Sequence, residues 1–242
     1  MQSDDEYHGY REQIASAISW ELIYQLMRRY HATYDFRIWE THPGGGQYDC
    51  LSVYSPSRIH HFDFNLQAQS LHIWDNSKYI ERLDIVNEYL HCNNPKEIVE
   101  QISSLAQLKS VAKLPQADGS VIACGVIATL FKLYIFSLFK LKMFMGYCDS
   151  SGYDNGIRRD KFLQFPSYKK LLDNIKDDND SFFLYKLFFL ENISINKVLC
   201  IFDMSGRLVL PSGEEILLED MYNIYNRDIN LLSSHIAAKL FN

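Results

Sequence analysis

The sequence predicts an α+β protein in which helices flank an antiparallel sheet, followed by a second, helix-rich α+β half. Three observations predict this fold class. Apolar residues recur at helical intervals near the N-terminus, the period then changes to two over four short segments, and helical periods return before a second mixed segment. With 242 residues, of which 47% are apolar and 22% charged, the chain is long enough to bury a substantial core.

The first half begins with a predicted helix over residues 9–33, because apolar residues from Ile14 to Tyr30 lie on one helical face. Alternating residues then predict four antiparallel strands, the first two joined by a glycine-rich hairpin loop at 42–46. Two helices follow, and the second begins at Pro95, a residue that suits a first helical turn. The predicted strands span 34–40, 47–54, 58–64 and 71–74, and the two helices span 76–91 and 95–110.

Residues 109–120 are the predicted linker, because they combine Pro, Gly and small polar residues with little apolar periodicity. We therefore expect one domain over 1–113 and a second over 119–242. The elements predicted for the second half are a helix at 121–145, a loop at 146–160, a short helix at 166–176, a strand or buried helix at 182–190, a hairpin of strands at 197–203 and 207–210, and closing helices at 214–226 and 228–241.

One apolar segment, residues 121–139, is long enough to span a membrane and contains a single charged residue, Lys132. Gly125, Thr129, Lys132 and Lys140 form a narrow polar stripe at helical intervals. A lysine in mid-span is costly in lipid, whereas on a mostly buried helix its ammonium group reaches water along the side-chain stem. The sequence therefore favours a core helix, with a membrane-surface helix as the alternative.

Charge and cysteine content exclude several classes of protein. The net charge is −6, from 24 basic and 30 acidic residues without a basic run, so we expect no nucleic-acid partner. Five scattered cysteines are too few for a disulfide scaffold, and the polar N-terminus lacks the apolar segment of a signal peptide. We therefore expect a cytoplasmic protein with reduced thiols, no cofactor and no membrane span.

The histidines of the predicted sheet are the best metal candidates. His60, His61, Asp63 and His72 lie on two neighbouring strands, and three N or O ligands suit a catalytic zinc or iron. Their spacing matches no recognised metal motif, so ordinary sheet histidines are the favoured interpretation. A metal-dependent enzyme built on these residues is the alternative function.

Aromatic residues are abundant, with 16 Tyr, 15 Phe and 3 Trp, and several fall on the predicted sheet. Tyr and Trp on a half-exposed sheet are typical binding anchors, although core packing is the competing explanation. A polar, turn-rich loop over 147–160 is a further candidate for partner contact. The predicted partner-binding residues are Trp39, His42, Gly44, Gly45, Gly46, Tyr48, Tyr54, Trp74, Tyr153 and Arg158.

Four strings resemble the divergent TY-chaperone families of bacterial conflict systems: IWETHPGGGQYDCLSVYS, RIHHFDFN and LHIWD in the first half and GYCDSSGYDNG in the second. The order of predicted elements in the first 110 residues is similar to the type III secretion chaperone fold. In that fold a twisted antiparallel sheet, flanked by helices, binds an extended effector segment. The resemblance implies a protein that binds peptides or toxin-like proteins, and it brings no catalytic residues.

We therefore expect a non-enzymatic peptide chaperone, or an immunity-like partner, of a bacterial effector or toxin. The glycines of the 42–46 loop would allow close approach of the partner's backbone, and an exposed strand edge would add main-chain hydrogen bonds. The negative charge favours a basic partner, chiefly through the association rate. A homodimer is left open.

Overall fold

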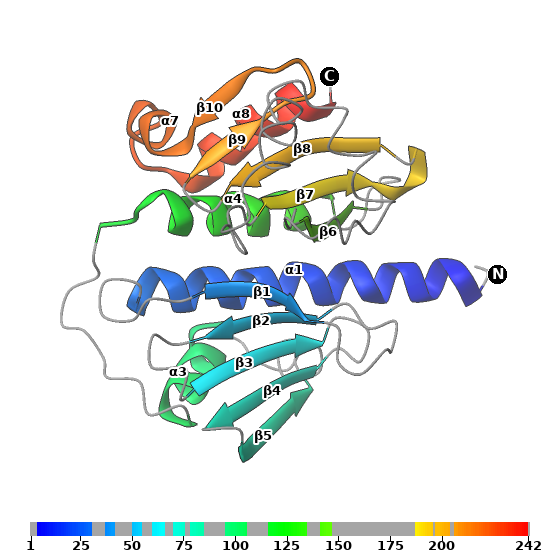
Figure 1. Cartoon of the computed structure of the whole chain (residues 1–242), viewed down its shortest axis with the longest axis vertical. Coiled ribbons are helices and arrows are strands. Elements are labelled where there is room, and N and C mark those ends of the chain that lie inside the picture. The colour runs from blue at the N-terminus through cyan, green and yellow to red at the C-terminus, as the bar shows by residue number, and fades with distance from the viewer. Residues whose placement is uncertain are drawn as a thin grey trace, which may run out of the picture. The chain divides into compact units, whose positions relative to one another are not determined.

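The computed structural model divides into two compact units (Figure 1). One comprises Met1–Ala117 with Cys124–Ser137, and the other Asp118–Ala123 with Leu138–Asn242. The domain limits expected at 1–113 and 119–242 stay a prediction. The structure describes residues 4–30, 37–41, 50–54, 60–65, 70–75, 78–84, 95–105, 116–134, 141–146, 187–195, 197–203 and 206–241.

The first unit combines a five-stranded sheet with helices α1 (Asp4–Tyr30) and α3 (Pro95–Leu105), which contact each other. Every neighbouring pair in the order β1-β2-β3-β4-β5 is antiparallel, so the sheet is a meander. The N-terminal helix, the four predicted strands and the helix that begins at Pro95 are confirmed. The five strands are β1 (Arg37–Thr41), β2 (Cys50–Tyr54), β3 (His60–Asn65), β4 (Ser70–Asp75) and β5 (Lys78–Asp84).

The C-terminal half of α1 lies in the core. All seven residues from Ala17 to Ile23 are buried, including the polar Ser19 and the acidic Glu21. Trp20 is among the largest side chains without exposure. A helix that is buried on successive residues, rather than on one stripe, is surrounded by other elements.

The second unit contains another antiparallel sheet, in the order β10-β9-β8-β7-β6. The strand predicted at 197–203 is β8, and the last predicted helix is α8. Burial follows the sheet, since Val198 to Phe202 of β8 are all buried. The elements are β6 (Leu141–Gly146), β7 (Leu187–Asn192), the short η2 (Ile193–Ile195), β8 (Lys197–Asp203), β9 (Arg207–Val209), β10 (Glu215–Leu217), α7 (Leu218–Ile224) and α8 (Ile229–Phe241).

The predicted helix at 76–91 is wrong over Lys78–Asp84, which form strand β5. The segment KYIERLD has apolar residues at spacings that fit either period, so local sequence does not decide. Pairing with β4 decides instead, because its backbone hydrogen bonds complete the sheet.

Two further helix predictions extend into strands. The helix predicted at 121–145 is α4 (Gly119–Tyr134), and Leu141–Gly146 form strand β6. The helix predicted at 214–226 begins instead with strand β10, and only then continues as α7. Short apolar runs cannot be assigned to strand or helix by periodicity alone, and sheet pairing settles both cases. Residues 109–115 of the linker, the loop at 147–160 and the helix at 166–176 lie outside the described residues.

Helix α4 is a core helix in the part that was a candidate membrane span. Val121 to Ala128 are all buried, and Lys132 and Leu133 near its end are exposed. Among the described residues, no helix is both long enough and apolar enough to cross a bilayer.

The N-terminus of α4 is capped by two acidic side chains. Asp118 Oδ1 accepts hydrogen bonds from the Val121 amide at 3.0 Å and the Ser120 hydroxyl at 2.7 Å. Glu219, from α7, accepts the Gly119 amide at 2.6 Å. These oxygens satisfy amides that have no partner within the helix, and their charge suits the positive end of the helix dipole.

The turn between β8 and β9 lies against the same helix end. Gly206 has φ +93°, and a Cβ built on it would lie 2.5 Å from the Gly119 Cα. The Gly206 carbonyl also accepts the Leu218 amide at 2.8 Å, which fixes the start of α7. Only glycine fits this position, for reasons of both backbone conformation and space.

We expect Gly206→Ala to lower the free energy of unfolding by about 3 kcal/mol or more, because an added methyl group meets backbone atoms. Gly213→Ala is the matched control, since Gly213 has φ +88° with nothing within 4 Å of its built Cβ. Its cost should be about 1 kcal/mol, from backbone strain alone. Urea unfolding measures both, and equal losses would contradict the steric explanation.

Candidate functional site

Two rows of paired residues cross the sheet of the first unit. One row is Trp39, Ser52, Asp63, His72 and Arg82. The other row is Arg37, Tyr54, His61, Trp74 and Tyr79. Directly paired residues share a face, and so do residues two apart on one strand. Both rows therefore occupy the same face over β1 to β4, and a register shift between Ile73 and Trp74 accounts for the step of three residues from Arg82 to Tyr79 on β5. We name this face the aromatic face.

Three of the predicted anchor residues lie on the aromatic face. Trp39 is on β1, Tyr54 on β2 and Trp74 on β4. Trp39 pairs with Ser52, so it is the diagonal neighbour of Tyr54. Tyr54 and Trp74 lie in the same row, two strands apart, which corresponds to about 10 Å between their backbones. The register therefore gathers these three residues into one region.

The opposite face of the sheet has a different composition. Two of its rows are Ile38, Val53, Phe62, Ile73 and Glu81, and Glu40, Leu51, Phe64, Leu71 and Leu83, each apolar except for one glutamate on an outer strand. Alternation between apolar rows and mixed aromatic and polar rows is typical of an antiparallel sheet with one face on the core. By this pattern we expect the apolar rows on the core side and the aromatic face on the other.

The metal candidates are divided between the two faces. Asp63 pairs with His72, and His61 is two residues from Asp63, so these three share the aromatic face. His60 pairs with Asp75 and belongs to the other face. The residues that the structure describes contain no group of three or more His, Cys, Asp or Glu that could hold a metal ion. The metal-enzyme alternative stays a prediction.

The remaining predicted partner-binding residues fall on segments outside the described ranges, chiefly the segment between β1 and β2. The strand ends Thr41 and Cys50 pair directly, so the segment 42–49 connects two adjacent strands. In the order of the sheet, β1 and β5 are the outer strands. The site residues outside the described ranges are His42, Gly44, Gly45, Gly46, Tyr48, Tyr153 and Arg158.

Among the described cysteine side chains, Cys124 and Cys200 are completely buried. Burial raises the pKa of the Cys200 thiol well above its usual value of 9.0, because desolvation disfavours the thiolate. A reactive cysteine needs the opposite shift. Cys200 therefore acts as a small apolar group of the β8 core.

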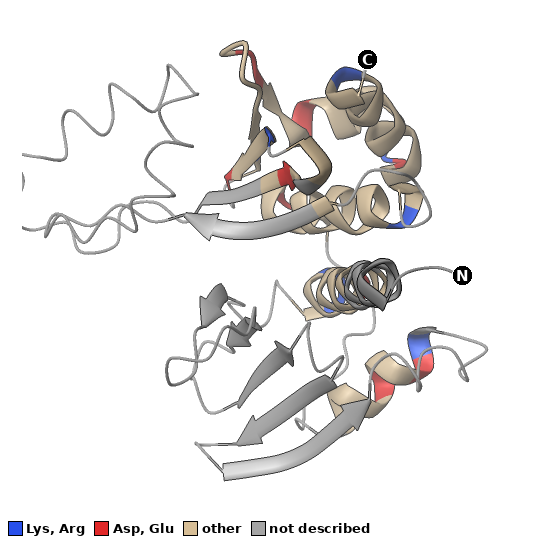
Figure 2. Ribbon diagram, turned by 90° about the vertical axis from the view of Figure 1, so that its right-hand side faces the viewer, with Lys and Arg blue, Asp and Glu red and all other residues tan. Residues whose placement is uncertain are grey.

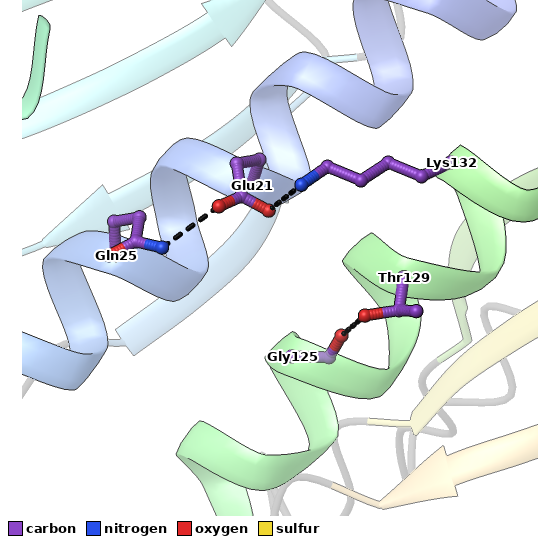
Figure 3. A network of polar contacts seen from close by, with 5 residues as sticks. All are labelled: Glu21, Gln25, Gly125, Thr129 and Lys132. Carbon is purple, nitrogen blue, oxygen red and sulfur yellow. Dashed lines mark hydrogen bonds and ion pairs between the residues drawn. The ribbon is translucent and has the colours of Figure 1, made fainter. Parts of the chain in front are cut away.

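A charged contact inside the first unit links α1 to α4 (Figure 3). Lys132 Nζ lies 2.5 Å from Glu21 Oε2, and Gln25 Nε2 donates to Glu21 Oε1 at 2.8 Å. The Glu21 side chain is 11% exposed and that of Lys132 46% exposed. A mostly buried carboxylate thus receives two donors, one of them the ammonium group of a partly exposed lysine.

The exposed position of Lys132 agrees with the prediction from its place in an apolar helix, whereas Glu21 is not among the residues predicted to be important. The signal was present, because Glu21 is the one charged residue in the run IASAISWELIYQLM. An acid within such a run is a candidate for a buried, paired charge. Its partner could not be found from sequence, since Lys132 is 111 residues away.

We expect Lys132→Met to lower the free energy of unfolding by about 1–2 kcal/mol, because it leaves the Glu21 carboxylate buried with a weaker set of partners. The double variant Glu21→Gln/Lys132→Met should recover part of that loss. Lys239→Met is the control, since its pair with Glu214 is more exposed and should contribute less than about 1 kcal/mol. The test is urea unfolding of the wild-type protein and the three variants. A double variant that is less stable than Lys132→Met would contradict the prediction.

Comparison with known proteins places these features in a family. A family model described as "T3SS (YopN, CesT) and YbjN peptide-binding chaperone 2" (TY-Chap2) matches residues 17–242. No curated protein and no solved structure matches the chain. The matched range begins in the buried half of α1 and includes both sheets and α8. The chain therefore belongs to the TY-Chap2 family of T3SS (YopN, CesT) and YbjN peptide-binding chaperones.

Proposed function

We propose that this peptide-binding chaperone is a cytoplasmic, non-enzymatic partner of a bacterial effector or toxin, and that it binds a segment of that protein on the aromatic face. The family supports a peptide or protein partner in general terms. The observation that carries the finer proposal is the register, which brings Trp39, Tyr54 and Trp74 to one face of one sheet. Aromatic residues gathered on one surface are typical of binding hot spots.

The same face offers polar groups between the aromatic residues. Asp63 and His72 form a direct pair between the row positions of Trp39 and Arg82, and His61 lies between Tyr54 and Trp74. An extended segment lying across such a face would bury apolar side chains on the aromatic residues and meet hydrogen-bonding groups between them. This combination suits recognition of a peptide rather than of a purely apolar ligand.

Two physical factors define the kind of partner. The net charge of −6 favours a basic partner through faster association. The outer strand β1 carries Trp39, so a segment that paired with this strand would also reach the aromatic face. A chaperone and an immunity protein would differ in dissociation rate, because a chaperone has to release its client.

Tryptophan fluorescence offers a direct test. The three tryptophans are Trp20, which has no exposure, and Trp39 and Trp74 of the aromatic face. The partner is first recovered with the untagged protein from its native host, and overlapping synthetic peptides of that partner are then titrated. In a Trp20→Phe background we expect the binding peptide to change the emission of Trp39 and Trp74, because it removes water from their rings.

Truncation of the anchors supplies the affinity test. Trp39→Ala/Trp74→Ala should weaken binding of that peptide by at least about tenfold, since buried aromatic anchors carry much of the binding energy of an interface. Ile195→Ala is the control, because Ile195 is 60% exposed on η2 in the second unit. Fluorescence anisotropy of the labelled peptide gives the affinities, and circular dichroism shows that both variants fold. Unchanged affinity in the folded double variant would refute the proposal.

A further inference from the structure

Exposed apolar residues gather in one part of the second unit. Among the described residues, five large apolar side chains are exposed, and three of these fall within residues 217–231. Leu217 ends β10 and is 52% exposed, Ile224 ends α7 and is 68% exposed, and Leu231 lies in the first turn of α8. Figure 1 shows β10 leading directly into α7. Such a concentration points to an interaction surface rather than to isolated exposed residues.

The spacing of these residues defines a stripe along α7. Leu217 is the N-cap residue, Met221 follows after four positions and Ile224 after three more, so the three lie along one side of the helix. The inward side is separate, because Leu218 has no exposure and Tyr222 is half-buried. We name Leu217, Met221 and Ile224 the α7 stripe. Helix α7 thus buries Leu218 in the core and leaves Leu217 and Ile224 exposed, with the half-buried Met221 between them.

The surroundings of the α7 stripe are acidic. Residues 214–228 contain five acidic residues and one arginine. Two of the acids are paired with basic residues of adjacent elements, Glu214 with Lys239 at 2.7 Å and Glu215 with Arg207 at 3.7 Å. Figure 2 colours these charged residues on the described part of the second unit.

Two acidic residues of α7, Glu219 and Asp220, have no ion pair with a basic side chain among the described residues. Glu219 accepts a hydrogen bond from the neutral Gly119 amide, and Asp220 is exposed directly before Met221. Their position in the first turn of α7 suits the positive end of the helix dipole, which explains why acidic residues occur there. The dipole does not explain why Leu217 and Ile224 are exposed nearby. An apolar row next to uncompensated negative charge is complementary to a segment that is both apolar and basic.

We propose that the α7 stripe, together with Asp220, docks a basic apolar segment of a partner protein. Its leucine-like side chains would cover Leu217, Met221 and Ile224, and its lysine or arginine groups would lie near Asp220. This surface belongs to the second unit and shares no residue with the aromatic face. It is therefore a second contact surface, and the proposal for it does not depend on the proposal for the aromatic face.

A pair of synthetic peptides tests the chemistry of the occupant. The probes are fluorescein-labelled GKLKLKLKG and its acidic counterpart GELELELEG, titrated into the full-length protein. We expect the basic peptide to bind at least about tenfold more tightly, with an affinity that falls as sodium chloride is raised. Equal binding of the two peptides, or no binding of the basic one, would overturn the proposal.

Variants locate the site. Ile224→Ser should weaken binding of the basic peptide by about tenfold, and Asp220→Asn by about threefold at low salt. Ile195→Ser is the matched control, because it removes an equally exposed isoleucine from the same unit and should leave the affinity unchanged.

Two results would refute the assignment. One is an equal loss in Ile195→Ser, and the other is full binding by a folded Ile224→Ser protein. Sedimentation velocity examines the competing occupant, a second copy of this chain. A wild-type dimer that Ile224→Ser converts to a monomer would assign the α7 stripe to self-association and overturn the proposal.

Discussion

The chain has to bury helix α4 almost completely while satisfying the polar groups at its two ends. Val121 to Ala128 are buried, whereas the side chains that cap the first turn, Asp118 and Glu219, are exposed. Asp118 and Glu219 supply oxygens for the first turn, and Lys132 joins the far end to Glu21 of α1. An unsatisfied amide or carboxylate in such surroundings would cost as much as several good packing contacts contribute. Much of the remaining detail, including the glycine at 206 and the acid at the start of α7, follows from this requirement.

The aromatic face shows how one sheet can serve both stability and recognition. Alternation along each strand separates the apolar rows from the rows that contain Trp39, Tyr54 and Trp74. A peptide-binding family member needs a surface whose shape does not depend on the client, and a five-stranded meander holds residues from different strands at fixed spacings. If the proposed function holds, the anchors would remain constant while hydrogen bonds to the client's backbone accommodate different sequences.

The sequence predicts an element correctly where its local apolar pattern agrees with the environment that the element has in the fold. Strand β8, helix α8 and the first four strands follow from period and turn signals, and the register then places three of the predicted anchors on one face. Strands β5, β6 and β10 were missed, because their short apolar segments satisfy both periods and only pairing with a neighbour selects the strand. The partner of Glu21 and the exposure of Ile224 depend on contacts between distant parts of the chain, which no local pattern contains.

The division of α4 has a consequence for how the protein can be taken apart. Its first turn belongs with the second unit, whereas Cys124–Ser137 belong with the first. A cut after Ala117 would thus separate the first unit from a segment that completes it, and would leave the Glu21 carboxylate without its lysine. We therefore expect a fragment of residues 1–117 to need the α4 residues 124–134 in order to complete its fold.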